Sequence, residues 1–232
     1  MNSASSPSNP RGRRWKLLLV VAIVPVLLMG GIGWYFTGAA LFPGWQIEGL
    51  GPCSERRIEG FGKECGDLRK LDELQFSDFA APTDRGYEVP AWFLPVTAQR
   101  SPMARPDFPA RHGFTAGRYA AIFAHGGGAD RREAYRLARY FLDRGFDYYM
   151  PDLVCHGLAA CPQPGLSFGV REHRDLVDLV RAMIGRHNYA GVVLIGTSVG
   201  ANSTLLAFNE LQRDAQTATS LRAIIAENPM YS

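Results

Sequence analysis

Short apolar runs alternate with amphipathic segments through the second half of the chain, and this alternation is the feature that most restricts its fold. A strand buried on both faces of a sheet is a continuous apolar run, whereas a covering helix carries one apolar face. The order strand, helix, strand predicts an α/β fold, with a mostly parallel sheet and helices on both faces. We expect strands at 119–124, 146–150, 191–195 and 221–226, and helices at 131–144, 176–184 and 199–211.

Two more strands are expected upstream, at 74–79 and 87–96, because both segments are rich in aromatic and β-branched residues. The sequence PTDRG at 82–86 predicts a turn between them. Residues 100–117 hold three prolines and two glycines, which indicates a surface loop. Ligands of such sheets bind beyond the carboxyl ends of the parallel strands, so the candidate site is expected there.

An uncharged apolar segment, LLLVVAIVPVLLMGGIGWYF at 17–36, is about long enough for one crossing of a bilayer. Basic residues between 11 and 16 precede it, which predicts a cytoplasmic N-terminus and an exported remainder, periplasmic or extracellular. We expect an uncleaved membrane anchor. The alternative is a signal peptide cleaved near the small residues at 37–40.

The composition, 47% hydrophobic and 20% charged, is that of a globular protein and excludes a disordered scaffold or a fibrous protein. The net charge is +3, and part of the basic excess lies in the short run before the apolar segment. Binding of nucleic acid usually needs basic residues spread along a helix face or a groove, so no nucleic-acid partner is expected.

Four cysteines fall into two pairs, Cys53 with Cys65 and Cys155 with Cys161. Each pair could close a short disulfide in an oxidising compartment, and four free thiols are the alternative, since spacing alone proves no bond. No CxxC or clustered Cys/His pattern is present, so no metal site is expected.

The strongest chemical signal is GTSVG at 196–200, a G-x-S-x-G motif between an expected strand and an expected helix. A nucleophilic serine needs a sharp turn that exposes its hydroxyl, and Gly196 and Gly200 would let strand and helix approach closely. The turn also points the Val199 N–H, at a helix N-terminus, towards a developing oxyanion. Ser198 is therefore the predicted nucleophile. The alternative is a plain tight turn with a capping serine.

The sequence HGGG at 125–128 follows the strand at 119–124. Glycines leave backbone N–H groups unobstructed, so Gly127, together with Gly126, is predicted to complete an oxyanion hole. A flexible loop or a phosphate cradle are the alternatives, but neither a Lys-Ser/Thr pair nor a G-x-G-x-x-G pattern accompanies the glycines.

These features together resemble the α/β-hydrolase superfamily, and more narrowly the membrane-anchored Bem46-like and S33 aminopeptidase-like hydrolases. The resemblance covers residues 74–229 and rests on the paired early strands, His125-Gly126-Gly127, the strand ending in Pro151-Asp152, and the GTSVG turn. It implies hydrolysis of an ester, thioester or amide through an acyl-enzyme on Ser198, with no cofactor. The implied partners are a small-molecule or lipid-like substrate and, through the N-terminal helix, the membrane.

Two departures from the family pattern bear on activity. The turn after Asp152 keeps only His156-Gly157 of the family's Arg-Gly-His-Gly, and His156 is interpreted as a loop residue. The family's order along the chain is serine, acid, histidine, but the last histidine here is His187. Glu227, after the last expected strand, is a candidate acid, and a carboxylate without a catalytic role is the alternative.

The chain is expected to have four parts: a basic cytoplasmic tail at 1–16, a transmembrane anchor at 17–42, a linker at 43–73, and a partial α/β-hydrolase domain at 74–232. The last expected strand would be left as an open edge, which suggests a truncated fold without the catalytic Asp and His. We therefore expect a serine hydrolase of impaired activity. The alternatives are an inactive hydrolase-fold binding or scaffolding module at the membrane, and an intact hydrolase with an unusual base.

Overall fold

The computed structural model describes residues 10–41, 74–98 and 107–230, and the chain divides into two compact units, Met1–Phe42 and Pro43–Ser232. In the first unit, helix α1 (Pro10–Leu41) includes Leu18–Leu41, 24 residues long and apolar enough to cross a membrane. This length and composition fit both an anchor and a signal sequence. The helix starts inside the expected tail and includes its basic residues.

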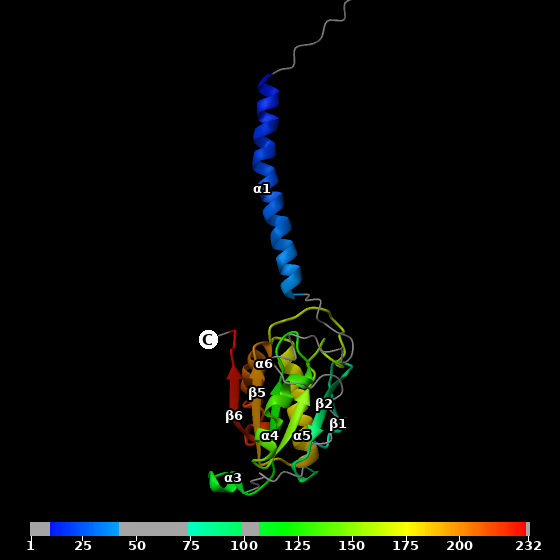
Figure 1. Ribbon diagram of the computed structural model, residues 1–232, viewed down its shortest axis with the longest axis vertical. Coiled ribbons are helices and arrows are strands. Elements are labelled where there is room, and N and C mark those ends of the chain that lie inside the picture. The colour runs from blue at the N-terminus through cyan, green and yellow to red at the C-terminus, as the bar shows by residue number, and fades with distance from the viewer. Residues whose placement is uncertain (1–9, 42–73, 99–106, 231–232) are drawn as a thin grey trace, which may run out of the picture. The chain divides into compact units, whose positions relative to one another are not determined.

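The second unit is built on a six-stranded sheet (Figure 1). The order across the sheet is β1-β2-β4-β3-β5-β6. The pairs β3–β4, β3–β5 and β5–β6 are parallel. Strand β2 is antiparallel to both β1 and β4. The expected mostly parallel sheet is therefore confirmed. The strands are β1 (Ser77–Pro82), β2 (Glu88–Leu94), β3 (Tyr119–Ala124), β4 (Phe146–Pro151), β5 (Gly191–Thr197) and β6 (Leu221–Glu227).

Helices cover both faces of the sheet, as the alternating pattern predicts. Helices α5 (Glu172–His187) and α6 (Val199–Leu211) pack on one face, and α4 (Tyr135–Leu142) packs on the other. The central strand β3 explains the two layers, because successive side chains point to opposite faces. Its residues 120, 122 and 124 belong to the core under α5 and α6, and residues 119, 121 and 123 belong to the core under α4.

Several element boundaries differ from the sequence prediction. Strand β1 begins at Ser77 rather than at 74, because β2 ends at Leu94 and the next residue, Pro95, has no N–H for the ladder. The expected helix at 131–144 is divided into a 3₁₀ turn, η3 (Arg131–Ala134), followed by α4. Short helical turns also form at η2 (Val96–Ala98), α3 (Phe108–Arg111), within the expected surface loop, and α7 (Ala215–Ala218).

Two sequence predictions fall on parts of the chain outside the described residues. These are the linker at 43–73 and the pair Cys53 and Cys65. The other cysteine pair is described: Cys155 and Cys161 form a disulfide with Sγ atoms 2.00 Å apart.

Candidate active site

The sequence GTSVG forms a sharp bend where β5 ends and α6 begins. Ser198 has φ 53° and ψ −114°, a backbone conformation that side chains other than glycine rarely adopt. Its N–H donates to the carbonyl oxygen of Glu227 over 2.9 Å, and its own carbonyl accepts the N–H of Asn202 over 3.1 Å. The Ser198 side chain is half-buried. The bend is thus fixed by one hydrogen bond to the end of β6 and one into α6.

The two glycines of the motif lie where neighbouring backbone leaves no space for a side chain. A Cβ at Gly196 would lie 2.2 Å from the carbonyl oxygen of Gly200. One at Gly200 would lie 2.1 Å from the carbonyl oxygen of Ala124, at the end of β3. Strands β3 and β5 and helix α6 can therefore meet only because both positions are glycine.

The glycine loop after β3 lies directly beside the bend. A Cβ at Gly126 would lie 3.7 Å from the Cβ of Ser198, and one at Gly127 would lie 3.2 Å from Cγ2 of Val199. The Gly126 N–H is already used, because it donates to the buried carboxylate of Glu133 over 2.8 Å. Of the predicted oxyanion-hole groups, Gly126 therefore has no N–H to offer in this structure.

The N–H groups of Gly127 and Val199 differ from that of Gly126. Neither donates a hydrogen bond within the described part of the chain. The Val199 N–H is also the first of α6, so it carries the partial positive charge of a helix N-terminus. Both amides are therefore left without an acceptor in the described residues.

Glu227 follows β6 and reaches the residue before the candidate nucleophile. Its carboxylate accepts a hydrogen bond from Oγ1 of Thr197 over 2.8 Å and forms an ion pair with Arg136. The hydrogen bond from Arg136 is the main reason that the pKa of Glu227 lies below its ordinary value. Arg136 also donates to Thr197 over 2.9 Å, so the three side chains form a closed cluster.

All five histidines belong to the described residues, and none is hydrogen-bonded to Ser198. The closest along the chain to the glycine loop is His125, which is fully buried. Its Nδ1 lies 2.8 Å from the Gly126 carbonyl oxygen, and its Nε2 accepts the N–H of Leu153 over 3.0 Å. Burial is the main cause that lowers its pKa to about 4, so the ring is neutral near pH 7.

His156 packs against the His125 ring with centroids 4.8 Å apart, and it too is buried. Its Nδ1 lies 2.9 Å from the Val154 carbonyl oxygen. The adjoining Gly157 has φ 51°, and a Cβ there would lie 2.3 Å from the carboxylate of Asp152. This turn therefore closes tightly around Asp152, a structural role consistent with the interpretation of His156 as a loop residue.

Asp152 itself is held in a buried ion pair. Its carboxylate accepts the backbone N–H of Arg131 over 2.7 Å and the Arg131 Nε over 2.8 Å, and it also accepts the N–H of Leu158. Both partners of the pair are at most 2% exposed. The pair connects the end of β4 to η3, the turn that carries Glu133.

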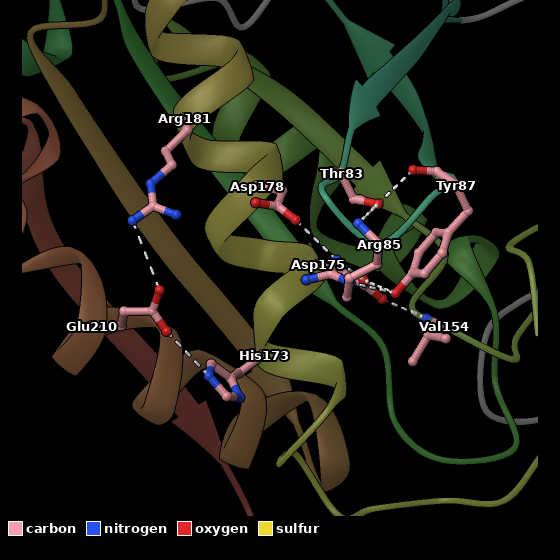
Figure 2. A network of polar contacts seen from close by, with 9 residues as sticks. All are labelled: Thr83, Arg85, Tyr87, Val154, His173, Asp175, Asp178, Arg181 and Glu210. Carbon is pink, nitrogen blue, oxygen red and sulfur yellow. Dashed lines mark hydrogen bonds and ion pairs between the residues drawn. The ribbon is translucent and has the colours of Figure 1, made fainter. Parts of the chain in front are cut away.

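A second polar cluster fixes the other side of the β4–α5 connection (Figure 2). The Asp175 carboxylate accepts the Val154 N–H over 2.6 Å, the Arg85 guanidinium over 2.8 Å and the Tyr87 hydroxyl over 3.0 Å. Burial is the main cause that raises the pKa of Asp175 to about 6. The turn between β1 and β2 is thereby attached to the start of α5 and to the loop after β4.

Sequence analysis missed the side chains that support the site. Glu133, Arg136 and Arg131 lie on one segment that the apolar pattern identified only as helical. Four arginines and a glutamate between 131 and 139 were a visible signal, because charged side chains that become buried must be paired or hydrogen-bonded. Their partners could not be named without the fold.

Comparison with known proteins gives one family match for the part of the chain that contains this bend. Residues 121–230 match the model of a family described as the Alpha/beta hydrolase family. This span runs from β3 through the glycine loop and the G-x-S-x-G bend to the residues after β6. No curated protein matches the sequence.

Solved structures share the fold at low sequence identity. The esterase Pf2001 of Pyrococcus furiosus matches in one crystal form with 15% identity and a TM-score of 0.51, over 79% of this chain and 57% of the esterase. A second crystal form gives 17% identity and a TM-score of 0.51, over 82% and 56%. A brefeldin A esterase, described as a bacterial homologue of human hormone-sensitive lipase, matches with 15% identity and a TM-score of 0.49, over 75% and 45%. The chain thus spans little more than half the length of the Pyrococcus esterase.

Proposed function

Because this chain has an α/β-hydrolase fold, we propose that it is a serine hydrolase that acts on an ester, thioester or amide bond through an acyl-enzyme on Ser198. One observation carries the proposal. Ser198 stands on a positive-φ bend between β5 and α6, next to the glycine loop, and the N–H groups of Gly127 and Val199 donate no hydrogen bond in the described chain.

The proposed reaction has two halves. The Ser198 oxygen attacks the carbonyl carbon, its proton passes to a base, and the carbonyl oxygen becomes an oxyanion. The N–H groups of Gly127 and Val199 stabilise that charge, with the N-terminus of α6 adding a favourable field. The C–O, C–S or C–N bond then breaks and the leaving group takes up a proton. Water repeats the sequence on the acyl-enzyme and releases the acid.

The base is the part of this mechanism that the described residues do not supply. A serine hydroxyl is a poor nucleophile near neutral pH unless a neighbouring group accepts its proton. No histidine is hydrogen-bonded to Ser198 in the described structure. We therefore propose that acylation by this chain is slow, and that Glu227 supports the bend through Thr197 rather than orienting an imidazole.

The absence of a histidine hydrogen bond to Ser198 in the described structure also supports a second candidate function. Without a base beside Ser198, the domain would be an inactive hydrolase fold that binds a small-molecule or lipid-like ligand or acts as a scaffold at a membrane. The α1 stretch Leu18–Leu41 would provide the anchor. The Cys155–Cys161 disulfide is consistent with export of the domain, because disulfides persist in oxidising compartments.

Labelling with a fluorophosphonate probe tests the proposal on the full chain in detergent micelles. The probe reacts with activated serines, so slow labelling that disappears in Ser198→Ala supports the hydrolase. Added imidazole, a soluble substitute for the missing base, is expected to accelerate labelling of Ser198. Absence of labelling both with and without imidazole would overturn the hydrolase and favour the binding module.

A further inference from the structure

Leu166 lies against Gly127, one of the two residues that we propose as oxyanion-hole donors. A Cβ at Gly127 would lie 3.3 Å from Cδ2 of Leu166 and 3.2 Å from Cγ2 of Val199. Leu166 is only 7% exposed. Apolar atoms therefore pack directly on the backbone of the glycine loop, at the point where it meets the start of α6.

The residues after Leu166 are fixed by a buried carboxylate. Glu172, which is fully buried, accepts the Ser167 N–H over 2.9 Å, the Ser167 hydroxyl over 2.5 Å and the Gly169 N–H over 2.8 Å. The Asn202 side chain donates to the Phe168 carbonyl oxygen over 3.0 Å. Asn202 belongs to α6, so these bonds connect the Leu166 loop to the helix that begins at the bend.

The residues before Leu166 are held as well. Arg171 donates to the carbonyl oxygens of Gln163, over 2.7 Å, and of Gly165. The Cys155–Cys161 disulfide closes the segment further upstream. A surface loop of this length would ordinarily be mobile, and so many constraints on one segment indicate that its position matters.

We propose that Leu166 is a positioning residue for the oxyanion hole, an inference that rests on the proposed hydrolase function. Its methyl groups hold the Gly127 backbone in place, so the amide needs no reorientation when the oxyanion forms. They also exclude water that would compete for the Gly127 N–H. Both effects act on the transition state, because preorganised donors in a water-poor site stabilise charge that develops only there.

The test compares variants of the full chain in detergent micelles by the kinetics of labelling with an alkyl fluorophosphonate in the presence of imidazole. The maximal labelling rate and the half-saturating probe concentration are measured separately. Leu166→Ala is expected to lower the maximal rate about tenfold, less than the loss of a whole oxyanion-hole donor, and to leave the half-saturating concentration within about twofold. Leu166→Met, of similar volume, is expected to restore most of the rate.

Two further variants complete the comparison. Leu158→Ala changes a leucine that is 50% exposed in the same segment, and it is expected to label like the unmodified chain. Glu172→Gln weakens the bonds that hold the loop and is expected to lower the maximal rate in the same direction as Leu166→Ala.

The outcomes separate the two proposals. If Ser198 is not labelled in the unmodified chain, both the hydrolase and the role of Leu166 are overturned. If Ser198 is labelled but Leu166→Ala labels at the same maximal rate, only the positioning role is overturned. A change confined to the half-saturating concentration, or a loss that Leu166→Met does not restore, would also overturn it, since either result would indicate contact with the probe or general damage.

Discussion

The backbone N–H of Ser198 donates to the carbonyl oxygen of Glu227 over 2.9 Å, so the end of β6 supports the bend at the end of β5. The bond joins the two strands where Gly196 pairs with Ala226 and Thr197 pairs with Glu227. It continues the sheet ladder by one step into a residue whose φ of 53° is unfavourable for serine. Support from β6 explains how the chain keeps that conformation.

We expect Ser198→Gly to stabilise the domain while abolishing fluorophosphonate labelling. Relief of the strained backbone, about 1–3 kcal/mol, should exceed the entropy that glycine adds to the unfolded chain, about 0.4–1 kcal/mol. Ser198→Ala is the matched control, because it removes the hydroxyl but keeps the Cβ, and its stability should stay within about 0.5 kcal/mol of the unmodified chain. Denaturant unfolding measures both. Equal stability of the two variants would contradict the assignment of strain to this residue.

Gly200→Ala should prevent correct folding or cost at least about 3 kcal/mol, because the new methyl group meets a backbone carbonyl that cannot move aside. A Cβ at position 200 would lie 2.1 Å from the carbonyl oxygen of Ala124. Gly185→Ala is the control: nothing lies within 4 Å of a Cβ there, in α5, and the change should stabilise by about 0.5–1 kcal/mol. Thermal unfolding of the two variants distinguishes steric exclusion from a general intolerance of alanine.

The buried ion pair of Arg131 and Asp152 should be far more sensitive to substitution than an exposed one. Arg131→Ala leaves the Asp152 carboxylate buried without its charge partner, and such changes cost about 3–5 kcal/mol. Arg111→Ala breaks a pair with Asp107 whose side chains are 73% and 50% exposed, so it should cost about 0–1 kcal/mol. If urea unfolding gave a similar loss of unfolding free energy for both variants, burial of the ion pair would not determine its contribution to stability.

Stability should fall in mild acid because of His125. Its pKa is about 4 in the folded chain against 6.5 for a free histidine, so folding favours the neutral ring. The sign follows directly: the stabilising contribution is present above pH 6.5 and is lost as the pH falls towards 4, to a total of about 3 kcal/mol. His125→Gln should lack this component. Unfolding free energies measured between pH 7 and 4 test it by the difference in slope.

Asp175 should oppose the loss of folding stability that His125 causes in acid. Burial raises its pKa from 3.8 to about 6, so its contribution is largest below pH 3.8 and is lost as the pH rises through 6. Acidification therefore stabilises the folded chain through Asp175 while destabilising it through His125. In Asp175→Asn the free energy of unfolding should fall more steeply with decreasing pH than in the unmodified chain. A shallower loss would mean that the carboxylate is ionised in the folded state at low pH.

The sequence predicted the layers and the bend well because both depend on local patterns. A short run of apolar residues such as 191–195 is typical of a buried strand, and the glycines of the G-x-S-x-G that follows it indicate a tight turn. The use of the Gly126 N–H by Glu133 could not be predicted, since it depends on the 3₁₀ turn that brings the carboxylate back to the loop. The contact of Asp175 with Arg85 joins residues 90 positions apart, which only the assembled sheet brings together.

The strand order has a consequence for synthesis. Strand β3 pairs with β4 on one side and with β5 on the other, and β5 is made only after the whole of α5. Until β5 is made, the backbone N–H and C=O groups along one edge of the apolar strand β3 have no partner, and such non-local pairing is slow. A chaperone that shields this edge, or passage of the chain through a translocation channel before it folds, would protect it during that interval.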